Sequence, residues 1–136
     1  MKSLKSVNHI GYAVKNIPAV AHYYLEAGWV MSEIYEEHVQ NTKIAFLKKD
    51  GFPTIELVSP LNETPSPVDN VIRKNGNAPY HICYNVDDIE ETVEELYEEG
   101  FNPLFMPVES VAMDNHMICY MQHKDLGLIE LVEDKI

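Results

Sequence analysis

The chain has 136 residues, enough for one domain of ordinary size with its own core but not for two independent ones. Ten basic and 22 acidic residues give a net charge of -12, and such a surface repels phosphate backbones and anionic lipids, so we expect no nucleic-acid partner and no membrane partner. Short apolar runs and a start without an apolar signal core predict a cytoplasmic protein. Two cysteines are too few for a disulfide framework or a cysteine-rich zinc site.

The first elements are predicted from alternation and capping signals. Residues 7–14 alternate between two faces, which is typical of a strand. A helix follows, because Asn16 suits the N-cap, Pro18 fits the first turn and Gly28 is a C-terminal stop. Three further strands are expected at residues 31–39, 42–48 and 54–58.

The same order of elements is predicted again after a proline-rich linker, residues 59–79, which holds a short helix near residues 67–74. A strand at residues 80–86 is followed by a helix that Asp87 or Asp88 caps and Gly100 ends. The last three strands are expected at residues 102–106, 117–121 and 127–132.

An internal repeat explains this order. Residues 9–17 read HIGYAVKNI and residues 81–89 read HICYNVDDI, with five of nine positions identical, and the tetrapeptide IELV occurs at residues 55–58 and 129–132. The chain is therefore predicted to be an α+β protein of two βαβββ modules, about residues 7–58 and 80–133. We expect the paired modules to form one domain, a half-barrel around a shared cleft that holds a metal.

The repeat places two histidines and two glutamates at equivalent positions. His9 and His81 lie on the first strands, and Glu56 and Glu130 lie on the last. Successive side chains of a strand point to opposite faces, so we expect the glutamates on the concave face, opposite their apolar neighbours Ile55, Leu57, Ile129 and Leu131.

Two carboxylates about 4 Å apart repel by about 4 kcal/mol at an effective dielectric constant of 20, and a divalent cation removes that repulsion. Two nitrogens and two oxygens suit Ni²⁺, Co²⁺, Mn²⁺ or Fe²⁺, and also Zn²⁺. A single strand histidine is more often structural than a ligand, but two matched pairs of equivalent residues, His9 with His81 and Glu56 with Glu130, favour a metal site.

The stretches HIGYAVKNI, IELVSPLNETPSPV, YHICYNVDDIEETVEEL and GLIELVE resemble the vicinal oxygen chelate superfamily of glyoxalases, bleomycin resistance proteins and dioxygenases. Within it they are most similar to methylmalonyl-CoA epimerase and more loosely to bacterial glyoxalase I. The resemblance implies a homodimer whose metal binds two substrate oxygens and stabilises an enediolate after a carbon-bound proton is removed.

The resulting prediction is a metal-dependent epimerase or isomerase that acts on an acyl thioester or a similar small acid. The predicted metal ligands are His9, Glu56, His81 and Glu130, and Glu130 and Glu56 are also the candidate bases. Some epimerases carry a glutamate base on the strand at residues 42–48, where this chain has Lys43. The alternatives are a lactoylglutathione lyase of the glyoxalase I type, an extradiol oxygenase, and a non-catalytic small-molecule binding protein of the same fold. The metal site of an extradiol oxygenase would not account for the fourth ligand.

Overall fold

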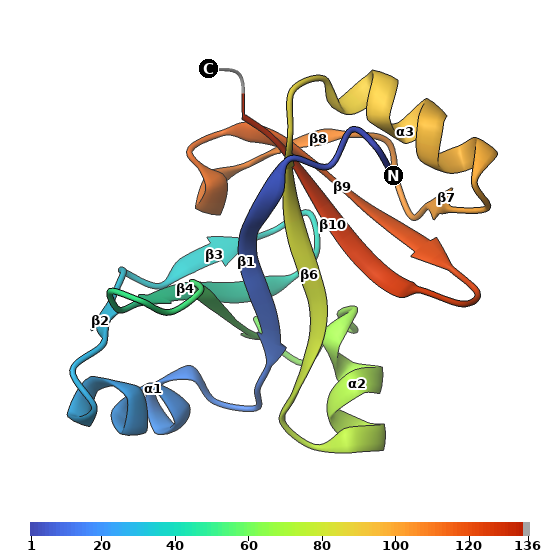
Figure 1. Ribbon diagram of the computed structural model, residues 1–136. Helices are drawn as coiled ribbons and strands as arrows, with labels where there is room; N and C mark the ends of the chain where they lie inside the picture. The colour runs from blue at the N-terminus through green and yellow to red at the C-terminus, as the bar shows by residue number, and fades with distance from the viewer. Residues whose placement is uncertain (135–136) are drawn as a thin grey trace. The chain divides into compact units, whose positions relative to one another are not determined.

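The computed structural model describes residues 1–134 (Figure 1). It divides into two compact units. One is His9–Tyr80, and the other combines Met1–Asn8 with the chain from His81 onward. None of the helices in the described part of the chain is long and apolar enough to cross a membrane.

In the unit His9–Tyr80 the strands lie in the order β2-β4-β5-β1. β1 is parallel to β5, β5 is antiparallel to β4, and both β2 and β3 pair with β4. The elements are β1 (Ser6–Ala13), α1 (Ile17–Glu26), β2 (Val30–Met31), β3 (Tyr35–Glu37), β4 (Thr42–Lys48), β5 (Ile55–Pro60) and α2 (Val68–Asn75).

The second unit repeats this pairing, with strands in the order β6-β10-β9-β7. β6 is parallel to β10, β10 is antiparallel to β9, and both β7 and β8 pair with β9. The elements are β6 (Ala78–Val86), α3 (Ile89–Glu98), β7 (Asn102–Pro103), β8 (Val108–Ser110), the 3-10 turn η1 (Val111–Met113), β9 (His116–His123) and β10 (Gly127–Glu133). The predicted α+β class and the duplicated module are confirmed.

The predicted helix caps are confirmed. The side chain of Asn16 accepts the N–H of Ala19 at 2.9 Å, and the side chain of Asp88 accepts the N–H of Glu91 at 3.0 Å. Each bond satisfies a backbone donor that has no partner within the first turn of its helix. Past α3 the chain turns at Gly100, whose φ of +101° is a conformation that favours glycine.

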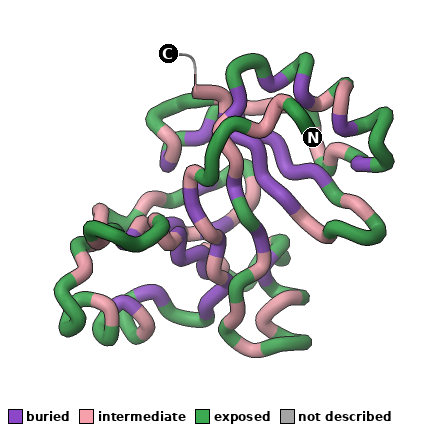
Figure 2. Tube along the Cα trace, in the orientation of Figure 1, coloured by how far each residue is buried: buried purple, intermediate pink, exposed green. Residues whose placement is uncertain are grey.

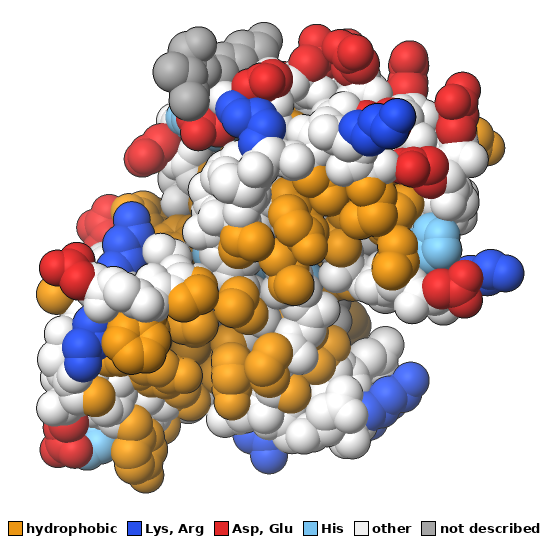
Figure 3. All heavy atoms as spheres, in the orientation of Figure 1, with side chains coloured by type: hydrophobic (Ala, Val, Ile, Leu, Met, Phe, Trp, Pro, Cys, Tyr) orange, Lys and Arg blue, Asp and Glu red, His pale blue; other side chains and the backbone are white. Residues whose placement is uncertain are grey.

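Each of these two helices covers one face of its own sheet. On α1 and the strands beneath it the buried apolar side chains are Val14, Ile17, Ala21, Ala45, Leu47 and Leu57. On α3 and its strands the larger members are Ile89, Leu96, Phe101, Met121, Ile129 and Leu131. Figure 2 shows the buried residues along β9 and β10, and Figure 3 shows acidic side chains gathered over α3. In each unit the opposite face of the strands is therefore not covered by this helix.

Two of the predicted strands are shorter than expected. The strand expected at residues 31–39 is divided into β2 and β3. Between them the hydroxyl of Ser32 accepts the N–H of Phe46 at 2.9 Å, so a side chain replaces a backbone acceptor in the pairing with β4. The strand at residues 102–106 is reduced to β7, and the chain pairs with β9 again only in β8, after Pro107, which has no N–H to donate.

Candidate functional site

The first His–Glu pair lies on adjacent parallel strands of one unit. In the register of β1 and β5, Gly11 is opposite Glu56, and His9 precedes that position on the same face. The Nε2 atom of His9 is 3.3 Å from Oε1 of Glu56. His9 is fully buried, and Glu56 is 2% exposed. These two buried side chains are therefore in contact.

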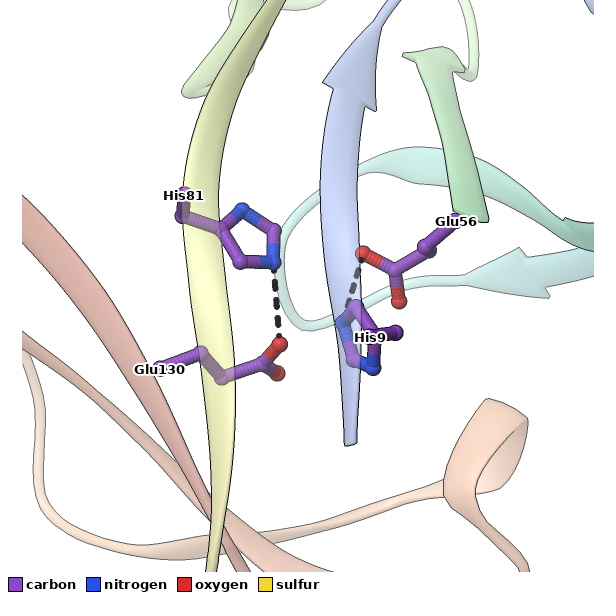
Figure 4. Close-up of side chains that lie close together, drawn as sticks. All are labelled: His9, Glu56, His81 and Glu130. Carbon is purple, nitrogen blue, oxygen red and sulfur yellow. Dashed lines mark ion pairs between the residues drawn. The ribbon is translucent and has the colours of Figure 1, made fainter. Parts of the chain in front are cut away.

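The second pair repeats this arrangement in the other unit. Cys83 of β6 is opposite Glu130 of β10, and Nε2 of His81 lies 3.1 Å from Oε1 of Glu130. Both side chains are buried. Figure 4 draws the two pairs with a dashed line within each. The structure thus brings His9 together with Glu56 and His81 together with Glu130, whereas the predicted joining of all four in one site stays a prediction.

The side chains that flank each glutamate have the predicted orientation. Leu57 belongs to the core under α1 and Leu131 to the core under α3, so their neighbours Glu56 and Glu130 project from the opposite face of each sheet. On that face Glu130 lies directly across from Tyr120. The strands themselves hold the acidic groups away from the helices.

The chemistry of each pair fits a divalent metal. A buried carboxylate is strongly disfavoured unless a cation or hydrogen-bond donors compensate for its lost hydration. An imidazole nitrogen beside a carboxylate oxygen is a donor set that first-row divalent ions prefer. Each unit therefore offers two ligands of the right kind.

An aromatic residue that the sequence analysis did not single out supports each histidine. Phe46 of β4 lies opposite Glu56, and its ring meets that of His9 edge to face, with 5.6 Å between ring centroids. Tyr120 of β9 occupies the equivalent place, 5.1 Å from the ring of His81. The signal was available, because these two residues are separated by 74 positions, the same offset that relates the two IELV segments.

The strand β4, on which some epimerases carry a glutamate base, has no carboxylate in this chain. Lys43 pairs in register with Ser59, on the other face of the sheet from Glu56. On the face of Glu56, β4 presents Ile44 and Phe46. This strand therefore supplies no group that could take a proton beside Glu56.

Both cysteines, Cys83 and Cys119, are buried thiols that form no disulfide. Burial, together with the negative charge of Glu130, raises the pKa of Cys119 to about 11. Its Sγ contacts the carbonyl oxygen of Phe105 at 3.3 Å. Cys119 is therefore a neutral thiol near neutral pH.

The other four histidines lie outside the two pairs. His22 and His38 are exposed and lie beside Glu26 and Glu36 on their own elements. In the second unit, Nδ1 of His116 donates to the backbone carbonyl of Glu133 at 2.8 Å. The ring of His123 accepts the N–H groups of Asp125 and Leu126 in the turn between β9 and β10. These contacts give the last two histidines structural roles at strand ends.

Comparison with curated proteins finds relatives along nearly the whole chain. An ethylmalonyl-CoA/methylmalonyl-CoA epimerase from Cereibacter sphaeroides is 28% identical over 129 residues, which cover 92% of this chain and 95% of the relative. The mitochondrial methylmalonyl-CoA epimerase of Dictyostelium discoideum is 26% identical over 93% of this chain and 77% of the relative.

Solved structures have the same fold. A hypothetical protein from Bacillus halodurans C-125 is 30% identical, with a TM-score of 0.82 over 96% of this chain and 94% of that one. A variant of the Streptomyces coelicolor methylmalonyl-CoA epimerase in complex with 2-nitronate-propionyl-CoA is 25% identical, with a TM-score of 0.84 over 98% of this chain and all of the other. A family model matches residues 8–120, and the chain belongs to the glyoxalase/bleomycin resistance protein/dioxygenase superfamily that this model describes.

Proposed function

We propose that this chain is a divalent-metal-dependent epimerase that removes and returns the proton next to the carbonyl of an acyl-CoA thioester. The observation that carries the proposal is the pair of equivalent, buried His–Glu contacts, one in each unit. The names of the two curated relatives and the CoA compound in the Streptomyces coelicolor structure support an acyl-CoA as the substrate class.

In this proposal His9, Glu56, His81 and Glu130 together bind one ion, which is Ni²⁺, Co²⁺, Zn²⁺, Mn²⁺ or Fe²⁺. The four side chains are buried and offer two nitrogens and two carboxyl groups, a set that suits these ions. When bound, the ion supplies Lewis-acid stabilisation of the negative charge that develops on the substrate.

The protein's own groups then move the proton. An epimerase must take a proton from one face of a carbon and return one to the other face, so it needs two groups that can exchange protons. Glu56 and Glu130 are the two buried carboxylates of the pairs, and each has a histidine within 3.3 Å that orients it. In our proposal Oε1 of one glutamate, which is ionised, takes the proton, and the other glutamate, which starts protonated, gives its own proton to the opposite face of the carbon. Such proton transfer contributes about 10²–10⁴-fold to the rate.

Three further expectations belong to this proposal. The two modules form a single domain, the protein is a homodimer, and it works in the cytoplasm. Sedimentation velocity of the purified protein tests the second expectation, with a mass near twice 15.6 kDa as the expected result.

The test of the function is exchange of the substrate's α-proton. Metal-loaded protein is incubated in D₂O with methylmalonyl-CoA, and deuterium at the α-carbon is followed by mass spectrometry. We expect exchange in the wild type and its loss, by at least about 10²-fold, in Glu56→Gln and Glu130→Gln.

The matched control is His22→Ala, which removes an exposed histidine beside a glutamate and should keep the wild-type rate. Exchange that survives in both glutamine variants contradicts the assignment of the bases. Turnover of a glutathione hemithioacetal without thioester exchange favours the glyoxalase I alternative instead.

A further inference from the structure

The unit His9–Tyr80 contains a hollow at the first turn of α1, with a volume of about 490 Å³. We call it the α1 hollow, and its lining includes Lys15, Asn16, Ile17, Glu36, Lys43 and Ser59. Small-molecule sites commonly have volumes of about 300–1,000 Å³, so the hollow is large enough for a small organic ligand.

The α1 hollow lies on the helix side of the sheet. Lys43 of β4 and Ser59 of β5 are opposite each other in the register of the two strands. Alternation places them on the same face as Ala45 and Leu57, which belong to the core under α1. Glu56 projects from the other face, so the α1 hollow is separate from the candidate metal ligands of this unit.

A buried hydroxyl in the lining has no partner. Ser59 is only 4% exposed, and its side chain forms no hydrogen bond with any residue that the structure describes. Leaving a buried polar group without a partner is costly, and most such groups in folded proteins are hydrogen-bonded. The hydroxyl of Ser59 therefore points to a ligand that supplies the missing bond.

Two cations without ion pairs line the same hollow. Among residues 1–134, the side chains of Lys15 and Lys43 have neither an ion pair nor a hydrogen bond. Lys43 is opposite Glu36 in the register of β3 and β4, but the carboxylate of Glu36 lies beside the ring of His38, at 3.7 Å. The lining thus has more cations than anions in a chain whose net charge is -12, which favours an anionic ligand.

The first turn of α1 (Ile17–Glu26) adds a backbone donor. The N–H of Ala19 is bound by the side chain of Asn16, and that of Val20 lies 3.4 Å from the carbonyl oxygen of Asn16. Pro18 has no N–H. Of the four donors at the start of the helix, only the N–H of Ile17 is left without an acceptor in the described part of the chain. A free N–H at the positive end of a helix dipole favours an anion.

We infer that the α1 hollow binds a phosphate group, either as inorganic phosphate or on a small phosphate ester. The ammonium groups of Lys15 and Lys43 balance the charge of the dianion. The hydroxyl of Ser59 and the N–H of Ile17 donate to its oxygens. A phosphate group suits this set better than a carboxylate because it offers more acceptor oxygens and more charge. The inference does not depend on the proposed epimerase function, since none of these residues takes part in the proton transfer.

Titration of the full chain with inorganic phosphate in a calorimeter, at constant ionic strength, tests the site. We expect saturable binding to the wild type. Binding should be about tenfold weaker in Lys43→Gln and in Ser59→Ala, the loss expected for one hydrogen bond to a charged group. The matched control is Lys48→Gln, which removes the same charge from the opposite face of the same strand and should alter the Kd by less than about twofold.

Amide spectra of ¹⁵N-labelled protein show where the phosphate binds and whether each variant is folded. The amide signal of Ile17 should shift as phosphate is added to the wild type, and its shift should need more phosphate in Ser59→Ala. Absence of saturable binding at millimolar phosphate overturns the inference. Equal Kd values in Lys43→Gln, Ser59→Ala and Lys48→Gln also overturn it, because the phosphate would then bind elsewhere.

Glycerol 3-phosphate distinguishes the two sources of the phosphate group. Tighter binding of this ester than of inorganic phosphate assigns the hollow to an ester, whose organic part contacts the apolar lining residues Ile34 and Pro60. Equal or weaker binding assigns it to phosphate itself. In either case the inference requires that Lys43→Gln and Ser59→Ala weaken the binding and that Lys48→Gln does not.

Discussion

Metal binding should stabilise the protein, and the extent depends on both His–Glu pairs. A ligand that binds only the folded state at 100 times its Kd adds about 2.7 kcal/mol to the free energy of unfolding. For 136 residues that unfold cooperatively, this corresponds to a rise of about 9 °C in Tm. We expect this rise for the wild type when Ni²⁺, Co²⁺ or Zn²⁺ is added to EDTA-treated protein in a calorimeter.

Variants in each unit test whether one ion uses both pairs. His9→Ala removes a ligand from the unit His9–Tyr80, and His81→Ala removes one from the other unit. Both should lose most of the rise in Tm, measured against the same variant in EDTA so that any loss of intrinsic stability cancels. The control His22→Ala removes an exposed histidine 3.4 Å from Glu26 and should keep the full rise. A rise that survives in His9→Ala or in His81→Ala refutes the four-ligand site, because the metal would then need only one pair.

Three other predictions concern the cysteines, an acidic contact and the core. Because the pKa of Cys119 is raised to about 11 and Cys83 is also buried, neither thiol should react with Ellman's reagent at pH 8 until the protein is unfolded. Hydrogen bonds from the N-terminal amine and Ser3 lower the pKa of Glu95 from 4.5 to about 2, so its stabilising effect should be complete above pH 4.5 and disappear as the pH falls towards 2. Comparing the urea unfolding of Glu95→Gln with that of the wild type across this range measures the effect. Leu131→Ala should cost about 2.7–5 kcal/mol in urea unfolding, whereas Leu126→Ala, at an exposed position, should change stability by less than about 0.5 kcal/mol.

Most of what the sequence predicts correctly about the strands comes from the internal repeat. Identical residues 72 or 74 positions apart predicted equivalent strands, and alternation within the two IELV segments predicted which side chains face the helices. The structure agrees on these faces, since Leu57 and Leu131 lie in the two helix-covered cores. Buried positions of this kind are strongly specified because a shift of one residue would exchange the two faces.

The edges of the sheets were predicted less well. Pairing there depends on single side chains that hydrophobic pattern does not describe, such as the hydroxyl of Ser32, which takes over a bond to β4. The orientation of Lys43 could not be predicted either, because it depends on the register of β4 against β5. That register depends on the loop between the two strands, and the sequence alone does not specify the loop's conformation. That register is what turns Lys43 away from Glu56.

The duplicated pairs differ in one respect that bears on the chemistry. Phe46 packs against His9, whereas Tyr120, at the equivalent place, carries a hydroxyl beside His81. Two pairs with identical surroundings would hold their carboxylates in equal states, yet epimerisation needs one group to accept the proton while the other gives one. An aromatic position that is apolar in one module and carries a hydroxyl in the other gives Glu56 and Glu130 different neighbours, and in the proposed mechanism the two glutamates have different tasks. In the proposed mechanism, therefore, the repeat supplies equivalent ligands, and the positions at which the two modules differ supply the difference between acid and base.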